Sequence, residues 1–382
     1  MNHLFDPQRR RWLGAGAGLV TMGTLGACSA WQPAGPRRPF STLPFARPDL
    51  RDEFVLREPV GARPFRRNGF VVRREAFGDK HLVHHYGHGG AGITLSWGSA
   101  LQAADTLDGQ ADRRAVVIGA GVVGLSTARV LQQRGWTVRL VAQAFSPDTT
   151  SDVAGGQFAP TAVLARSVAE PASLERLDNA LRASHAHYLG LIGRGYGVQW
   201  RENYHLLDAS RGDAIPEYVT QYPELFPDAM LLAGAEHPFP VTEVFHYRTL
   251  LIEPGIYLSR LMADFLAAGG SAMHASFQQR EELLMLPEPV LVNCTGLGAR
   301  WLFGDEELMP VRGQLVIVRP DPAMDYLTHG GGEGLLYCFP RSDGIVLGGS
   351  FQRGEWDYSP DPAISARILG EHRRLFAAMR IA

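Results

Sequence analysis

Three glycines at a fixed spacing carry the clearest chemical signal in this sequence. Gly119, Gly121 and Gly124 form the pattern G-x-G-x-x-G, directly after the apolar run AVVI at 115–118 and before a stretch of helical character. In such a turn the first glycine permits a tight bend, the second lets backbone approach a pyrophosphate, and the third lets helix pack on strand. The free N–H groups at the helix start bind phosphate. The pattern therefore predicts the strand–turn–helix unit of a dinucleotide-binding fold.

A second glycine-rich segment, HHYGHGGAGIT at 84–94, precedes a helical run at 95–107. Glycines at this density before a helix indicate backbone that lies against a flat or anionic ligand. The four histidines between His81 and His88 also raise the hypothesis of a metal site. However, the glycines disfavour a helix that would align these side chains, and no acidic or cysteine ligand lies close in the sequence. We therefore expect no metal here.

Three hydroxyl side chains, Thr149, Thr150 and Ser151, stand before the glycine pair Gly155 and Gly156. They indicate either capping and turn chemistry or a loop that faces phosphate, and the sequence leaves both readings open. The strand expected at 137–142 ends at Gln143, where an acidic residue usually binds ribose. An amide is a weaker acceptor, so the ribose contact is doubtful.

The rest of the sequence predicts the scaffold that positions these segments. The apolar run at 290–296 is typical of a buried parallel strand, and amphipathic periodicity predicts helices over 174–192 and 258–268. A further helix ends near Arg134 with Gly135 as its cap, and a last helix begins after Asp361. Strands of an antiparallel sheet are expected at 313–319, 334–339 and 344–350.

Composition and charge limit the function classes. The chain has 382 residues, of which 45% are hydrophobic, enough for two to three domain-sized units. The formal net charge is −2, and no long basic run follows the first residues, so no nucleic-acid partner is expected. Three cysteines give no disulfide framework.

The first residues have the character of a targeting segment. The run RRRWL at 9–13 resembles a twin-arginine export signal, and LGAC at 25–28 resembles a lipobox that would make Cys28 a diacylated N-terminus. A short apolar anchor that stays uncleaved is the alternative. A membrane span is disfavoured, because 13–27 is shorter than the roughly 20 apolar residues that a bilayer needs. We therefore expect a bacterial cell-envelope location with a lipid anchor in the membrane, followed by a Pro-rich tether over 29–55.

Four motifs together resemble the D-amino-acid oxidase family of FAD-dependent enzymes. They are VVIGAGVVGLSTA, TTSDVAGGQFAP, VNCTG and HHYGHGGAGITLSWGSALQAA, and the resemblance extends over nearly all of 56–382. It implies an α/β plus α+β fold, with a Rossmann-type FAD-binding domain and an antiparallel-sheet substrate domain. In the family, the segments similar to GARPFRRNG and HHYGHGGAG follow the other motifs. The changed order implies a circular permutation, with Ala382 close to Arg57–Gly61 in space.

The resemblance also divides the chain. It implies an FAD-binding domain at 56–165 and 286–302, to which the arginine segment 57–74 adds part of the substrate site, and a substrate domain at 166–285 and 303–382. The first residues themselves predict the export signal with lipobox at 1–28 and the tether at 29–55.

Site residues follow from the matched motifs. Arg63 would bind a substrate carboxylate, Tyr337 would donate to the same group, and the Gly90 carbonyl would accept from the substrate amine. No metal is implied. The expected FAD-binding residues are Gly89, Ala91, Gly92, Ile93, Thr94, Gly119, Gly121, Val122, Val123, Gly124, Gln143, Thr149, Thr150, Ser151, Gly156 and Gln157.

The implied function is FAD-dependent oxidative deamination of D-amino acids or small amines such as glycine, with O2 or another electron acceptor. Glu333, where the family often has an aromatic lid residue, would disfavour acidic substrates or attract basic ones. Three alternatives remain: a dehydrogenase that passes electrons to a membrane or protein acceptor, a non-catalytic envelope binding lipoprotein, and an NAD-dependent dehydrogenase on the same glycine turn.

Overall fold

Two sheets organise the computed structural model, which describes residues 45–165, 169–208, 214–333 and 335–380. All of these residues lie in one unit, Arg38–Ala382. The calls on the export signal at 1–28 and on most of the tether fall outside the described residues. Within the described chain, every helix is too short or too polar to cross a membrane.

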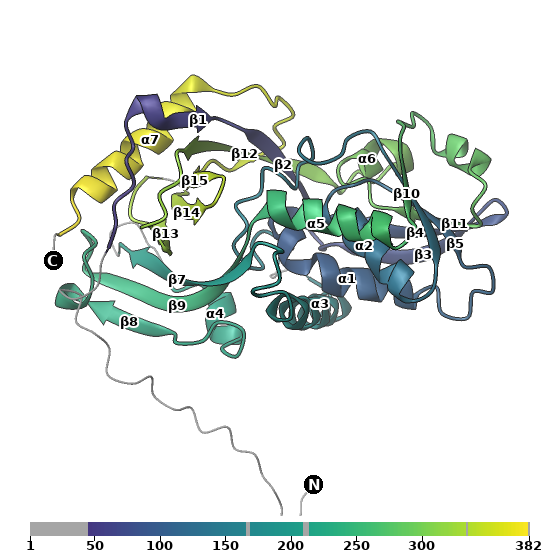
Figure 1. The fold of residues 1–382 in the computed structure, drawn as a ribbon, viewed down its shortest axis with the longest axis horizontal. Coiled ribbons are helices and arrows are strands. Elements are labelled where there is room, and N and C mark those ends of the chain that lie inside the picture. Colours follow the sequence, from purple (N-terminus) through teal and green to yellow (C-terminus); the bar gives the residue numbers. More distant parts are fainter. Residues whose placement is uncertain (1–44, 166–168, 209–213, 334, 381–382) are drawn as a thin grey trace, which may run out of the picture. The chain divides into compact units, whose positions relative to one another are not determined.

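The first sheet has the order β10-β6-β5-β11-β4-β3 (Figure 1). Its strands are β3 (Val71–Phe77), β4 (Lys80–Tyr86), β5 (Arg114–Ile118), β6 (Thr137–Ala142), β10 (Ser271–His274) and β11 (Val290–Asn293). All neighbours are parallel except β3 and β4. Strand β11 is buried at every position, as its unbroken apolar run predicts for a central parallel strand.

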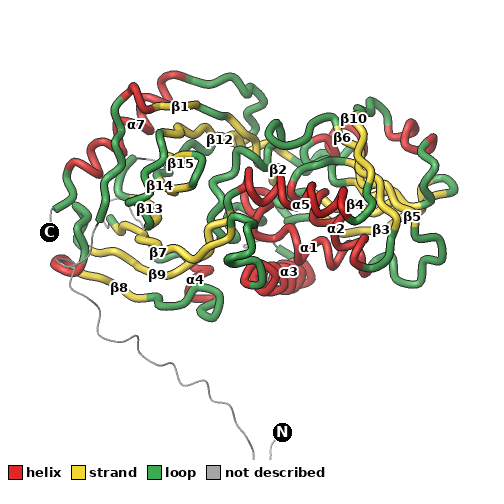
Figure 2. The backbone as a smooth tube through the Cα atoms, in the orientation of Figure 1, coloured by secondary structure: helices red, strands yellow, loops and turns green. Residues whose placement is uncertain are grey.

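Four helices pack together beside this sheet, as Figure 2 shows in red. Helix α1 (Gly92–Asp105) contacts α2 (Val122–Gln133) and α3 (Pro171–Leu189), and α2 contacts α5 (Pro254–Ala267). The short helix α6 (Gly298–Phe303) follows β11. The apolar residues of these helices and of the sheet form the largest core cluster.

The second sheet has ten strands in the order β1-β12-β15-β14-β13-β7-β9-β8, and both β2 and β16 pair with β12. Its strands are β1 (Val55–Arg57), β2 (Val60–Phe65), β7 (Val198–Leu207), β8 (Met230–Ala233), β9 (Glu243–Ile252), β12 (Met309–Val318), β13 (Tyr326–Gly330), β14 (Tyr337–Arg341), β15 (Gly344–Gly348) and β16 (Gln352–Arg353). Helix α4 is Glu217–Gln221, and helix α7 (Pro362–Ala377) packs on β12 and β15. One parallel pair, β7 and β13, makes this sheet mixed.

Strand β12 brings three parts of the chain together. Its first half pairs with β2 and β16, and its second half pairs with β1 and β15. Because these pairings are antiparallel and in register, β12 fixes the position of β2, the strand that carries Arg63. The predicted fold class, α/β plus α+β with a nucleotide-binding and a second, largely antiparallel sheet, is confirmed.

Two domain boundaries differ from the expectation. Strand β10 lies inside the range 166–285 assigned to the substrate domain, but it pairs with β6 in the first sheet. Helices α3 and α5, in the same range, pack on α1 and α2. The sequence motifs mark only the loops, so they do not show that the chain returns to the first sheet between β9 and β11.

The last part of the expected tether is folded against the second sheet. The Phe45 ring makes edge contacts with Tyr204, Phe239 and Tyr326, and Leu50 is buried. Residues 52–54 form a 3-10 turn that leads into β1. The expectation of an extended tether to residue 55 is therefore wrong for 45–55. Two isolated apolar anchors in extended backbone produce no periodicity that could reveal them.

The end of α7 lies beside this segment. Arg47 donates to the Met379 carbonyl, and Arg373 donates to the Leu50 carbonyl at 2.8 Å. Ala382 itself lies outside the described residues. The contacts of Arg373 and Met379 place the end of the described chain beside Arg47 and Leu50. These two residues come before Arg57–Gly61, the segment that was expected to lie near Ala382.

Candidate active site

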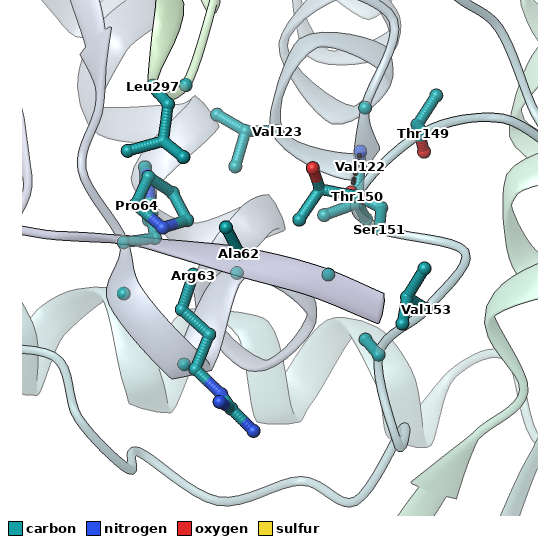
Figure 3. Close-up of a pocket in the computed structure, with 18 of the residues that line it drawn as sticks. Ala62, Arg63, Pro64, Val122, Val123, Thr149, Thr150, Ser151, Val153 and Leu297 are labelled. Carbon is teal, nitrogen blue, oxygen red and sulfur yellow. Dashed lines mark hydrogen bonds between the residues drawn. The ribbon is translucent and has the colours of Figure 1, made fainter. Parts of the chain in front are cut away.

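A pocket of about 1910 Å³ opens at the carboxyl ends of β4, β5, β6 and β11, the edge where parallel sheets bind ligands. Strands β2 and β14 of the second sheet also line it. Figure 3 shows β2 crossing this pocket, with Pro64 on the side of Val123 and Leu297 and the Arg63 side chain on the other side. The pocket therefore combines the glycine turn with the arginine segment.

The glycine turn has the geometry that its spacing predicts. Gly119 has a φ of +111°, and a Cβ atom on it would lie 2.4 Å from the Cys294 carbonyl oxygen. Gly119, Gly121, Val122 and Val123 line the pocket. Gly124 does not: a Cβ there would lie 1.9 Å from the Gly119 carbonyl oxygen. The expected ligand contact of Gly124 is therefore replaced by close packing of α2 on the turn.

The contacts of Thr149, Thr150 and Ser151, the hydroxyl loop, bear on the two interpretations that the sequence left open, turn chemistry and a loop that faces phosphate. The Thr149 hydroxyl donates to Asp152 Oδ2 at 2.7 Å, which is turn chemistry, and Ser151 Oγ accepts from the Val122 N–H at 3.0 Å. Thr150 lines the pocket beside them, and its hydroxyl forms no hydrogen bond with a described residue. Gln143 also lines the pocket.

The second glycine segment forms another wall of the pocket, with Gly92 next to Val122 of the glycine turn. Gly90 donates its N–H to the Ala162 carbonyl at 3.1 Å, and α1 then begins at Gly92 without a side-chain cap. The lining residues from this wall are Gly89, Gly90, Gly92, Ile93 and Thr94, with Gly156 and Gln157 from the neighbouring loop. Ala91 is fully buried and does not line the pocket, which corrects its expected role.

The histidines near this wall are held by neighbouring side chains. His85 Nδ1 lies 2.8 Å from Thr127 Oγ1, and His88 Nε2 lies 2.9 Å from Ser99 Oγ. Burial lowers the pKa of His88 to about 3, so its imidazole is neutral at physiological pH. Among the described residues there is no group of three or more side chains that could hold a metal ion.

Arg63 and Tyr337 meet at the other end of the pocket. Arg63 Nη1 is buried and has no hydrogen-bond partner among the described residues. Burial raises the pKa of the Tyr337 hydroxyl, while the adjacent Arg63 lowers it in part. A buried guanidinium N–H without an acceptor is costly, so this arrangement is suited to an anionic ligand.

A hydrogen-bonded pair that the sequence did not reveal lies beside Tyr337. His329 Nε2 donates to Gln157 Oε1 at 2.6 Å, and the His329 ring lies 5.6 Å from that of Tyr337. Burial lowers the pKa of His329 to about 3. Gln157 was expected at the cofactor, whereas this contact ties it to the arginine end. Glu333 is exposed and does not line the pocket, so its expected effect on substrates has no structural basis.

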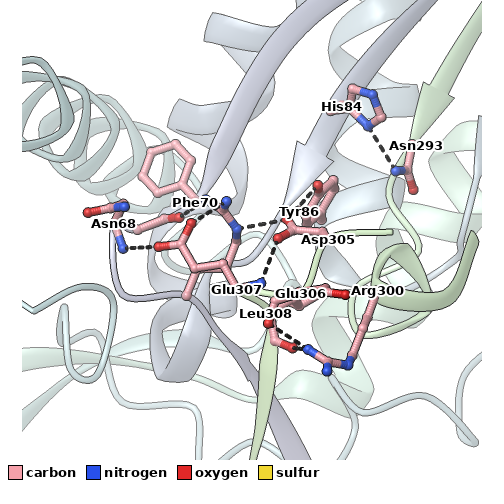
Figure 4. Close-up of polar contacts among 12 residues, drawn as sticks. Asn68, Phe70, His84, Tyr86, Asn293, Arg300, Asp305, Glu306, Glu307 and Leu308 are labelled. Atoms are coloured by element: carbon pink, nitrogen blue, oxygen red, sulfur yellow. Dashed lines mark hydrogen bonds and ion pairs between the residues drawn. The ribbon is translucent and has the colours of Figure 1, made fainter. Parts of the chain in front are cut away.

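An ion-pair network fixes the end of β2 (Figure 4). Arg66 Nε donates to Asp305 at 2.8 Å and Arg66 Nη2 donates to Glu307 at 2.6 Å. Asp305 also accepts from the Tyr86 hydroxyl at 2.7 Å, and Glu307 accepts from the Asn68 N–H at 2.9 Å. Because Arg66 follows Arg63 by three residues, this network holds the strand that presents Arg63.

Comparison with known proteins agrees with this site. The model of the DAO family, described as FAD dependent oxidoreductase, matches residues 114–382. The chain belongs to this family. A D-amino-acid oxidase of Streptomyces coelicolor is 32% identical over 72% of this chain and 80% of its own length. A human D-aspartate oxidase is 29% identical over 67% of this chain and 74% of its own.

Solved structures show the same fold. The glycine oxidase of Bacillus cereus superposes with a TM-score of 0.56 at 17% identity, over 70% of this chain and 78% of that chain. The iminodiacetate oxidase of Chelativorans gives a TM-score of 0.52 at 16% identity, over 69% and 79% of the two chains. At these identities the similarity concerns the fold alone.

The pocket fits FAD, the cofactor of the DAO family. Gly119 and Gly121 leave room for phosphate where side chains would collide with neighbours, and the uncapped starts of α1 and α2 present N–H groups. The expected FAD-binding residues all line the pocket, apart from Ala91 and Gly124. Several of them, from β4 to α1, precede the part of the chain that the family model matches.

Proposed function

We propose that this enzyme oxidatively deaminates D-amino acids or glycine. The unpartnered Nη1 of Arg63, buried in the pocket of an FAD-dependent oxidoreductase, is the observation that carries the proposal. A guanidinium binds a carboxylate through two parallel hydrogen bonds, which orients the substrate as well as holding it. The D-amino-acid and D-aspartate oxidases among the relatives support this substrate class.

Each polar group at this end has a defined task. The Tyr337 hydroxyl donates to the same carboxylate, and its raised pKa keeps it protonated at neutral and moderately alkaline pH. The Gly90 carbonyl accepts from the substrate amine. Bound FAD supplies the acceptor for the hydride that leaves Cα. The amine enters in its neutral form, loss of hydride from Cα leaves an iminium, and the iminium releases one proton to solvent. The resulting imino acid then hydrolyses to an oxo acid and ammonia.

Anaerobic flavin reduction tests the substrate class. Mixing the purified holoenzyme with D-alanine or glycine is expected to bleach the visible flavin absorbance, whereas L-alanine is not. The Arg63→Gln variant should retain its flavin and lose at least about a hundredfold in kcat/KM, because the charged bidentate contact is gone. If no D-amino acid and no glycine bleaches the wild-type flavin, the proposed function is wrong.

O2 or another electron acceptor takes the electrons in the second half of the reaction. The peroxide formed per substrate oxidised, compared with reduction of an artificial dye, distinguishes an oxidase from a dehydrogenase.

We further infer that the chain is a circular permutation of the family order. The family match begins at Arg114, although β2, β4 and α1 lie before it and line the same pocket. The Arg47–Met379 and Arg373–Leu50 contacts bring the two ends of the described chain together. Residues 106–113 form the connection between α1 and β5, and half of them are exposed. A chain in the family order whose two ends were joined at 106–113, and which was opened between residues 380 and 45, would account for both observations.

We propose that residues 1–28 direct export by the twin-arginine route and that Cys28 is lipidated, which places the enzyme in the bacterial cell envelope. The RRRWL and LGAC motifs support this proposal. Replacement of Cys28 by Ser should move the protein from the membrane fraction to the soluble fraction and abolish labelling by a radioactive fatty acid. Retention of label in the Ser variant would refute the assignment.

A further inference from the structure

A second arginine lies on the same face of the sheet as Arg63. On the β12 ladder, Val311 pairs with Arg63 of β2 on one side and with Arg353 of β16 on the other. Directly paired residues in antiparallel strands project to the same face, and two strand spacings put the two arginine Cα atoms about 10 Å apart. The two arginines are therefore neighbours across a single residue of β12.

The two guanidinium groups converge on one aromatic ring. The Cζ atom of Arg63 lies 5.7 Å from the centroid of the Phe351 ring, and the Cζ atom of Arg353 lies 5.6 Å from the same centroid. All three side chains line the pocket. The turn after β16 is held by a hydrogen bond from the Gly354 N–H to the Pro310 carbonyl at 2.9 Å. Arg353 is thus directed toward the carboxylate-binding end.

The Arg353 side chain is exposed, and it has no acidic partner and no hydrogen bond among the described residues. In contrast, Arg312 on the adjacent position of β12 donates to the Asp357 carbonyl and to Gln352. The charged residues that line the pocket, apart from histidines, are Arg63, Arg67, Arg353 and Asp148. Asp148 belongs to the hydroxyl loop next to Thr149, at the nucleotide end. The substrate end therefore has an excess of positive charge.

We propose that the substrates of this enzyme are amino dicarboxylates, and that Arg353 is the residue that selects them. The inference rests on the proposed function. Arg63 binds the α-carboxylate, and Arg353 binds the carboxylate at the end of the side chain. The two carboxyl carbons of a four- or five-carbon amino dicarboxylate are roughly 4–5 Å apart. The two Cζ atoms lie 5.7 and 5.6 Å from the same ring centre, so one such dianion reaches both guanidinium groups when its two charge-assisted contacts are not in line with each other.

The test compares substrates that differ in one charge. D-aspartate with D-asparagine, and D-glutamate with D-glutamine, are matched in shape. In anaerobic stopped-flow reduction, kcat/KM for the acid is expected to exceed that for its amide by about tenfold to a hundredfold, the size of one charge-assisted contact. The Arg353→Gln variant should reduce this ratio to near one, and Arg353→Lys should restore part of it.

Charge reversal separates recognition from a structural role. Arg353→Glu should reverse the preference, so that D-lysine reduces the flavin faster than D-glutamate does. Arg182→Gln, which removes an exposed arginine paired with Glu224 and outside the pocket lining, is the matched control and should leave every ratio unchanged. A wild-type acid-to-amide ratio near one, or a ratio that Arg353→Gln does not change, would overturn the inference while leaving amino acid oxidation intact.

Ligand binding to the holoenzyme gives a readout that needs no turnover. Succinate, which has the carboxylate spacing of aspartate, is expected to raise the thermal midpoint, and acetate at the same ionic strength is not, because only the dianion engages both arginines. Arg353→Gln should abolish the succinate shift. If this pattern appears but no amino acid bleaches the flavin, the dianion site stands and the proposed oxidation fails. If succinate and acetate act alike, Arg353 does not select a second carboxylate.

Discussion

Gly313 shows how closely the backbone is fitted to the side chain that we assign to carboxylate binding. A Cβ atom on Gly313 would lie 2.6 Å from Arg63 Nη1, and Gly313 of β12 pairs directly with Gly61 of β2. The guanidinium therefore occupies space that any other residue at this position would fill. The position of the Arg63 guanidinium therefore depends on the absence of a side chain at Gly313.

The first prediction concerns this contact. Gly313→Ala should displace the Arg63 guanidinium and raise KM for the amino acid by roughly tenfold to a hundredfold, since small misplacements of a positioning group are costly. Flavin content should stay the same, because the residue lies at the substrate end. Steady-state kinetics with each substrate measures the effect. Gly370→Ala, in α7 with open space around it, is the control and should change neither KM nor kcat.

The second prediction concerns acid stability. Burial lowers the pKa of His88 and His329 to about 3 and that of His187 to about 4, from 6.5. Between these values and 6.5 the unfolded chain binds more protons than the folded chain, so stability rises with pH in this window. It is complete above about 6.5 and is lost as the pH falls. The thermal midpoint should decrease from pH 7 to pH 5.

His187 allows a test of this cause away from the pocket. Its ring is stacked on Trp97 at 3.6 Å, so His187→Phe keeps the stack and removes the titrating group. The pH dependence of the midpoint should become shallower, by at most one proton's share, about 1.4 kcal/mol per pH unit. Tyr257→Phe removes only the hydroxyl near His187 Nε2 and should keep the original slope. Equal slopes for wild type and His187→Phe would contradict the assignment.

At the scale of the element, caps and unbroken apolar runs were the reliable sequence signals. Strand β6 has the bounds 137–142 that were expected, and Asp361 caps α7 by accepting from the Ala363 N–H at 2.8 Å. Strand β10, in contrast, is exposed at all four positions, so its residues SAMH carry no apolar pattern. Its strand character comes from pairing with β6, which sequence does not display.

The candidate active site shows the same difference between features that a local sequence pattern specifies and features that depend on pairing in the folded sheet. The glycine turn was predictable because a local pattern specifies it, and the positions of Arg63 and Tyr337 followed from the resemblance. His329 was missed because β13 is buried through Thr328 and shows no alternation between apolar and polar residues. Arg353 was missed because its relation to Arg63 depends on register across β12, which arises only in the folded sheet.

The third prediction concerns the segment that precedes β1. Phe45→Ala removes three edge contacts between aromatic rings and should lower the free energy of unfolding by about 2 kcal/mol, less than for a fully buried phenylalanine. Chemical denaturation measures this change. Leu56→Ala, at a side chain that is 55% exposed, should cost less than about 0.5 kcal/mol. Similar small effects at both positions would mean that the segment does not stabilise the fold.

At the scale of the whole molecule, sequence order and spatial order are separate properties. The glycine turn lies in the first sheet, although more than a hundred residues precede it in this sequence. What must be preserved is the meeting of β2, β12 and the first sheet around one pocket. The motifs themselves therefore specify the fold more strongly than their order in the sequence does.

The fourth prediction restores the family order. A chain that starts at Asp112, continues to Arg380, and is joined by a short flexible linker to Phe45 and on to Gln110 should fold and bind FAD, because the new break lies in the exposed connection before β5. Flavin content and thermal midpoint measure the outcome. Opening the chain at Ala100 instead, in the buried middle of α1, should give no folded flavoprotein. Failure of both chains would count against the permutation.

The folded segment at 45–55 also sets a limit on distance from the membrane. If Cys28 is acylated as we propose, only residues 29–44 separate the anchor from the first described residue of the body. Fully extended, these span at most roughly 55 Å, against about 95 Å for a tether that reached residue 55. The enzyme would then work within about one protein diameter of the bilayer surface.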